Sequence, residues 1–137
     1  MPEPTWHPIS ALPLVAHHVA GTLAASEEQL ATLGRARERP YLLDDATVAR
    51  LERVYTEQRE DLWLFEEQVR RWRALELDGV RRATVEELAG RVARLREVNA
   101  TVLAVAAELK AGTIERVLAM SDLELGLATL LRRAREP

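Results

Sequence analysis

Three stretches of this chain place residues, nearly all apolar, at alternating steps of three and four, and this spacing constrains the fold more than any other feature. The first stretch contains Ile9, Leu12, Ala16, Val19, Leu23, Ser26, Leu30 and Leu33. The second contains Val48, Leu51, Tyr55, Gln58, Leu62, Phe65, Val69 and Trp72. The third contains Val85, Leu88, Val92, Leu95, Asn99, Val102, Ala106 and Leu109. Such steps return to one side of an α-helix, so each stretch forms a seam for packing against other helices.

The spacing predicts an all-α fold, an antiparallel bundle of three long heptad-patterned helices followed by a short C-terminal helical hairpin. A chain of 137 residues has the length of one domain, so we expect a single helical-bundle domain over 1–137. Prolines make 1–8 an extended lead-in. The long helices are expected at 9–38, 44–77 and 84–111, and the short C-terminal helices at 113–135.

Capping residues set these expected boundaries. Asp44 or Asp45 caps the second helix, and Thr84 begins a capping box that opens the third. Gly112 is the kind of residue that ends a helix, and Ser121 begins another capping box inside 113–135. The hairpin at the C-terminus is predicted from these two signals.

Composition narrows the function classes. Cysteine is absent, which removes disulfides, thiolate catalysis and cysteine-ligated metals and favours a reducing cytoplasm. A net charge of -3 predicts no dedicated polyanion partner. No uninterrupted apolar run approaches 18 residues, so no membrane span is expected. Only one of the 19 basic residues is a lysine, which is typical of the base composition of a GC-rich bacterium.

Two groups of titratable residues could hold a metal, and neither has a recognisable motif. His17 and His18 are adjacent and point about 100° apart on a helix, so they do not easily share one ion. Glu57, Glu60 and Asp61 share one helical face, as in magnesium-dependent hydrolases. Pairs spaced i,i+4 favour a salt-bridged surface instead; they are Arg53–Glu57, Glu66–Arg70 and Glu67–Arg71. We therefore expect no cofactor and no metal.

The segment Arg70-Arg71-Trp72-Arg73 could stack on bases and neutralise phosphate. Trp72, however, falls on the second seam and is expected in the core. The arginines close one helix where Glu86 and Glu87 open the next, so the clusters complement the helix dipoles and face each other. These observations disfavour a nucleic-acid partner.

Apolar residues beside the seams predict a second contact surface. Leu62 to Phe65 are four consecutive apolar residues, and one helix face cannot bury all of them. We therefore predict partner-binding residues beside the second and third seams: Trp63, Leu64, Val98, Leu103 and Val105. Trp6 with Leu12 and Leu14, or the C-terminal helices, could cover them from within, through the apolar residues Ile114, Val117, Leu118, Leu123, Leu127, Leu130 and Leu131.

Asn99 is a polar residue on the third seam. It can fix register or oligomeric state if it meets a partner, or simply bond a neighbouring helix or water.

The function expected from the sequence is a non-enzymatic helical interaction or scaffolding protein that acts through protein–protein contacts and associates with itself, as a homodimer. The alternative is a nucleic-acid-associated regulatory protein that uses the arginine-rich helix ends. A magnesium-dependent helical hydrolase is the third possibility. The sequence names no partner, pathway or small-molecule ligand.

Overall fold

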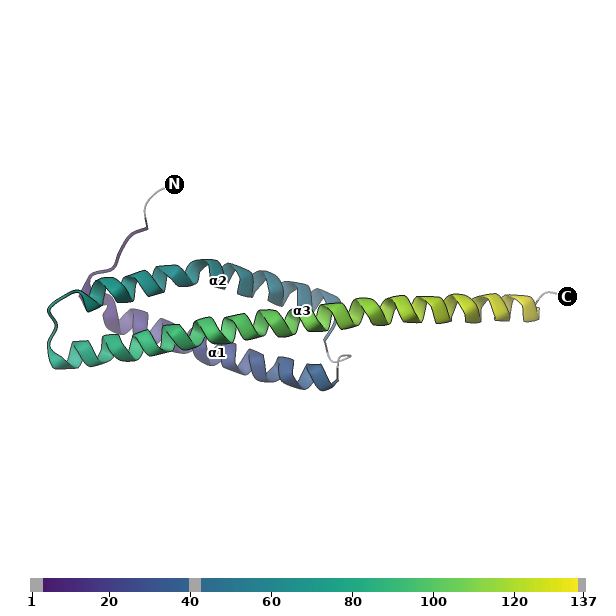
Figure 1. Cartoon of the computed structure of the whole chain (residues 1–137), viewed down its shortest axis with the longest axis horizontal. Helices are drawn as coiled ribbons and strands as arrows, with labels where there is room; N and C mark the ends of the chain where they lie inside the picture. The colour runs from purple at the N-terminus through teal and green to yellow at the C-terminus, as the bar shows by residue number, and fades with distance from the viewer. Residues whose placement is uncertain (1–3, 40–42, 136–137) are drawn as a thin grey trace.

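The computed structural model describes residues 4–39 and 43–135, with only the helical backbone described for 113–125 and 127–135. Across this part of the chain the fold is all-helical and without strands, as the sequence predicts. A short 3-10 turn, η1 (Ile9–Ala11), leads into α1 (Leu12–Glu38), and α2 (Asp45–Arg73) and α3 (Gly79–Arg135) follow (Figure 1).

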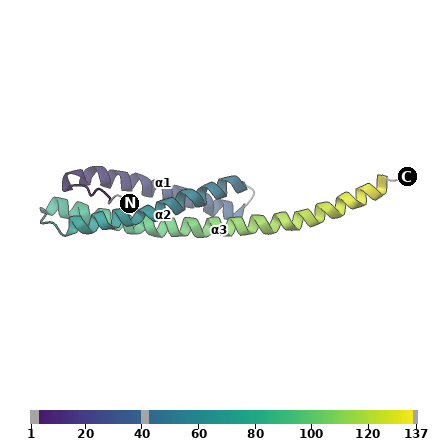
Figure 2. The ribbon, with the colours of Figure 1, turned by 90° about the horizontal axis from the view of Figure 1, so that it is seen from above.

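Helix α3 is the central element of the body. It packs along both α1 and α2, whereas α1 and α2 barely approach each other. Helix α2 runs in the opposite direction to α1 and α3, and α3 continues far beyond the ends of the other two helices (Figures 1 and 2). The molecule is therefore a three-helix body with a single projecting helix, called here the overhang (residues 113–135).

Helices α2 and α3 each begin next to an aspartate whose carboxylate caps the first turn. Asp44 is the N-cap of α2, and its carboxylate accepts a hydrogen bond of 2.7 Å from the Thr47 N–H. At α3, Asp78 accepts a bond of 2.8 Å from the Arg81 N–H, so the helix begins at Gly79 and not at the predicted Thr84 box. The cap at Asp78 sets the start of α3 in place of the one at Thr84, because it satisfies a free backbone N–H in the first turn after the loop.

Burial is unequal along the three seams. All eight seam residues of α3 are buried. In α1 every second seam residue is buried, namely Leu12, Val19, Ser26 and Leu33, and in α2 the buried seam residues are Val48, Tyr55, Leu62, Val69 and Trp72. The seam residues between them are only half-buried: Ala16, Leu23 and Leu30 in α1, and Leu51, Gln58 and Phe65 in α2. Most of these half-buried apolar residues still pack against the buried core, so each flanking helix leaves only part of their surface exposed.

The predicted break at Gly112 is not found, and neither is the C-terminal hairpin, because α3 is continuous to Arg135. A helix ends at glycine when the glycine adopts a positive φ, and no described glycine does so. Residues 113–135 contain no proline and are rich in Leu, Ala and Arg, which favour helix. The apolar side chains predicted to cover the bundle from 113–135 lie outside the described side chains.

Helix α1 is more apolar than its burial requires. Among the described residues, the stretch Ile9–Glu38 is long and apolar enough, by length and composition, to cross a membrane, although core helices and signal sequences meet the same criteria. The absence of an uninterrupted apolar run therefore did not exclude such a helix. Only 17% of its most apolar window is buried in the body.

Candidate interaction surface

The N-terminal lead-in is tied to α2 by hydrogen bonds to one backbone unit. The His7 N–H donates to Gln68 Oε1 at 2.7 Å, and Gln68 Nε2 donates back to the His7 carbonyl at 3.2 Å. The indole Nε1 of Trp72 donates to the same carbonyl, also at 3.2 Å. Gln68 and Trp72 are both buried, so these bonds satisfy polar groups that burial would otherwise penalise.

This attachment places Trp6 against the outer side of α2. The Trp6 and Trp63 rings meet edge to face, with centroids 6.2 Å apart, and the Arg71 guanidinium lies 4.5 Å from the centroid of the Trp6 ring. Edge-to-face and cation–π geometries are both favourable. Trp63 is covered on one side by Trp6 and still keeps 49% of its surface exposed.

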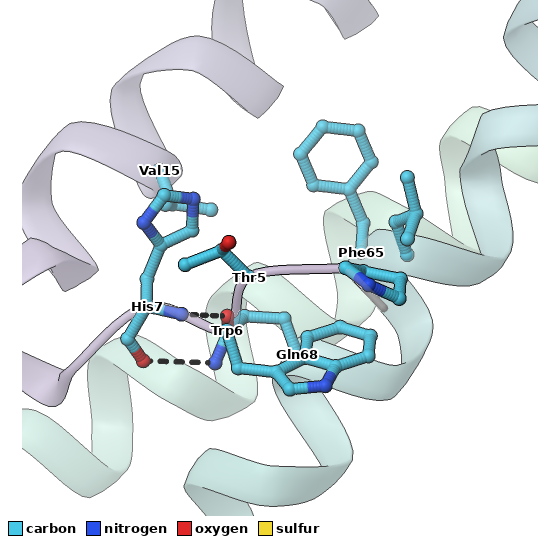
Figure 3. Close-up of a pocket in the computed structure, with 8 residues that line it drawn as sticks. Thr5, Trp6, His7, Val15, Phe65 and Gln68 are labelled. Carbon is cyan, nitrogen blue, oxygen red and sulfur yellow. Dashed lines mark hydrogen bonds between the residues drawn. The ribbon is translucent and has the colours of Figure 1, made fainter. Parts of the chain in front are cut away.

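Behind Trp6 lies a cavity of ≈ 370 Å³ between the lead-in, α1 and α2. Figure 3 shows Thr5, Trp6 and His7 on one side, with Val15, Phe65 and Gln68 around them. Its lining is mostly apolar, because the only polar side chain from α2, Gln68, is occupied by His7.

Two further cavities continue along the space between α1 and α2. The middle one, of ≈ 440 Å³, shares Leu64 and Phe65 with the first and has Leu62 and Leu95 among its lining residues. The third, of ≈ 350 Å³, shares Val54 with the middle one and reaches Thr47 and Gln29. Together these three cavities form a groove between α1 and α2, called here the α1–α2 groove.

Charged residues line the groove in a fixed order. Arg50 lines its far cavity, and Glu57 and Asp61 line its middle cavity. None of the three has an ion-pair partner among the described residues. His18 stacks on Phe65 across the groove, with ring centroids 5.9 Å apart.

The five residues predicted to bind a partner fall in three different environments. Trp63 is exposed, and Leu64 is half-buried in the groove wall. Val98 and Val105 are buried in the core, and Leu103 packs partly buried against it. The expectation that Val98 and Val105 form a second surface is therefore wrong for this body, since α3 lies against two helices and needs a wider apolar face.

Asn99 forms hydrogen bonds with α2, which is one of the two roles predicted for it from the sequence. Its Nδ2 donates to the Tyr55 carbonyl at 2.8 Å and to Gln58 Oε1 at 2.9 Å. Its Oδ1 is buried without a hydrogen-bond partner.

The arginine cluster at the end of α2 is paired within the chain. Arg70 and Arg71 bond Glu67, and Arg73 bonds Glu86 at 2.7 Å, so the predicted meeting of the two helix ends is observed. Glu66 bonds Arg96 of α3 and not the predicted Arg70. The hydrogen bond from Arg96 lowers the pKa of the Glu66 carboxyl below its ordinary value, and that from Arg73 does the same for the pKa of Glu86.

The remaining candidates show no cluster that binds metal. Among the side chains that the structure describes in 4–39 and 43–112, no three from His, Asp or Glu converge closely enough to hold an ion. His17 and His18 are exposed on α1, as are Glu57, Glu60 and Asp61 on α2.

Sequence reasoning missed the lead-in contacts of Gln68 and gave Trp6 only as one possible cover. Gln68 lies off the seam, and its partner is 61 residues away, so no local pattern signals the contact. Comparison of the chain with protein-family models, with curated proteins and with solved structures finds no match.

Proposed function

We propose that this chain is a non-enzymatic helical interaction protein that associates with itself through the surface around Trp63 and Leu64. The observation that carries the proposal is the half-exposed Trp63, held in place by Trp6 beside an apolar groove. A fixed, exposed indole is the side chain that most often anchors a protein interface. Leu14, 72% exposed on α1, and Val54, 46% exposed on α2, extend the apolar surface.

The proposal treats the three helices as an antiparallel, coiled-coil-like scaffold and the association as a homodimer. The direction of α2 and the continuous burial of the α3 seam support this scaffold. The absence of cysteine supports a cytoplasmic setting, and the arginine-rich composition supports a bacterial one.

The test is Trp63→Ala, followed by sedimentation and chemical denaturation of the same samples. We expect the wild-type dimer to dissociate into folded monomers, because the central anchor of the contact is removed. Val80→Ala is the matched control, since Val80 is 80% exposed near the start of α3 and should change neither mass nor stability. An unchanged mass with lower stability would assign Trp63 to internal packing against Trp6 and remove the proposed surface.

A further inference from the structure

The α1–α2 groove resembles the position of a missing fourth helix in a four-helix bundle. Most half-buried seam residues of α1 and α2 pack against the core and keep part of their surface exposed, so the groove leaves apolar area uncovered. The most apolar stretch of α1 is only 17% buried. One more helix laid in the groove would cover this exposed apolar area, as in a four-helix bundle.

The chain itself carries a stretch of helix that extends past the ends of α1 and α2. The overhang is 23 residues of continuous helix beyond α1 and α2, about 34 Å long at 1.5 Å per residue (Figure 1). On α2 the groove runs from Thr47 to Gln68, about 32 Å by the same measure. In sequence the apolar spacing of three and four is interrupted at Thr113 and Arg116 and resumes in the overhang with Met120, Leu123, Leu127 and Leu130.

We infer that the α1–α2 groove binds the overhang of a second copy of this chain, reciprocally, in a two-fold symmetric dimer. This inference rests on the proposed self-association and adds to the contact at Trp63 a second one in the groove, whose wall includes Leu64. The overhang cannot enter its own groove, because α3 is unbroken and leads away from the body along a gentle curve (Figure 2). A second copy can supply it without any helix breaking.

The order of charges supports one direction of docking. Along α2 the groove presents Arg50 first, and Glu57 and Asp61 follow seven and eleven residues later. In the overhang beyond Glu115 and Arg116, the acids Asp122 and Glu124 are followed by Arg132 and Arg133 eight to eleven residues later. A partner overhang parallel to α2 therefore places acids near Arg50 and arginines near Glu57 and Asp61. The opposite direction would bring like charges together.

Two-fold symmetry requires the same direction. In a dimer whose α3 helices run antiparallel, the partner's overhang is antiparallel to this chain's α3. Helix α2 is also antiparallel to α3, so the partner's overhang lies parallel to α2 (Figure 1). With Asp122 beside Arg50, Arg133 lies beside Asp61, so the overhang covers the groove up to that point. The contact is reciprocal, so the assembly closes at two copies.

The first experiment exchanges charges in the full-length protein and measures the dimer dissociation constant by sedimentation. Glu57→Arg with Asp61→Arg, and separately Arg132→Glu with Arg133→Glu, should each weaken association about tenfold or more. The four substitutions together should restore it to near the wild-type value. Glu60→Arg is the matched control, because Glu60 lies on α2 outside the groove lining and its reversal should have no effect. Circular dichroism on each variant confirms that the helices are retained.

The second experiment uses the absence of native cysteine. Protein carrying Glu57→Cys is mixed with protein carrying Arg132→Cys and oxidised, and we expect a disulfide between the two variants. A disulfide between two copies of the Arg132→Cys protein would show that overhangs pair with each other, which overturns the groove docking and leaves self-association standing.

Two other results separate the inference from the proposed function. A dimer that dissociates with Trp63→Ala but ignores every charge exchange would overturn the groove docking alone. A protein that stays monomeric at all concentrations would overturn both the groove docking and the proposed self-association. Binding of such a monomer to phosphatidylglycerol vesicles through α1 would have the same consequence.

Discussion

Asn99→Leu should stabilise the protein. Asn99 is 1% exposed on the α3 seam, and its Oδ1 has no hydrogen-bond partner. Removing a buried, unsatisfied carbonyl recovers about 1–3 kcal/mol of desolvation cost. A buried leucine gains about 1.5–3 kcal/mol of apolar transfer free energy over leaving it exposed.

The loss is smaller than this gain. Asn99 donates two hydrogen bonds, to the Tyr55 carbonyl and to Gln58 Oε1, each contributing about 0.5–1.5 kcal/mol net. The Tyr55 carbonyl lies inside α2, where helical bonding continues to satisfy it, and Gln58 is half-buried and can bond water. The balance is a stabilisation of about 1–2 kcal/mol, which we expect as a higher midpoint in urea denaturation with an unchanged m-value.

Asn99→Ala is the matched variant for this prediction. It removes the same two bonds without replacing the side-chain volume, so it should be destabilising. A loss of more than about 1 kcal/mol in Asn99→Leu would refute the reasoning, because the amide would then contribute more to stability than its two bonds can account for.

Two more predictions concern stability. Leu95→Ala should cost about 2–5 kcal/mol, since Leu95 is 1% exposed, and a loss below about 0.5 kcal/mol in chemical denaturation would contradict its place in the core. The lowered pKa of Glu66 means that the Glu66–Arg96 pair stabilises the fold above the carboxyl's unfolded pKa and that this stability is lost as the pH falls through the lowered folded pKa. Both side chains are more than a third exposed, so the contribution is at most about 0.5 kcal/mol. In a plot of the urea unfolding midpoint against pH, Glu66→Gln should therefore slightly reduce the fall of the midpoint at acid pH. An unchanged fall would show that solvent fully screens the ion pair.

The helical seams could be predicted from sequence because burial of a helix face depends on local spacing. All eight predicted seam residues of α3 are buried, and α1 ends at the predicted Glu38. The boundaries of α3 could not be predicted, since Asp78 competes with Thr84 as a cap and Gly112 is compatible with both a helix end and a helix interior. Only the folded backbone decides between such alternatives.

The candidate surface was predictable only in part. Trp63 follows from four consecutive apolar residues, which one helix face cannot bury. The same argument failed for Val98 and Val105, because it assumed that each helix needs a single seam. Helix α3 packs against two helices, so a wider face of it is buried. The bond from Gln68 to His7 depends on chain segments 61 residues apart, which no local spacing encodes.

The unequal burial of the seams is the strongest physical argument for a contact beyond one copy of the chain. The half-exposed apolar residues of a seam lie at the same helical spacing as the buried ones. Their exposed part is apolar surface that remains in contact with water. This occurs on both sides of the α1–α2 groove and not on α3. In sequence the overhang resumes the apolar spacing at Met120, beyond the ends of α1 and α2. Pairing groove and overhang between two copies would cover the exposed apolar area of the groove with the apolar positions that the overhang carries in sequence.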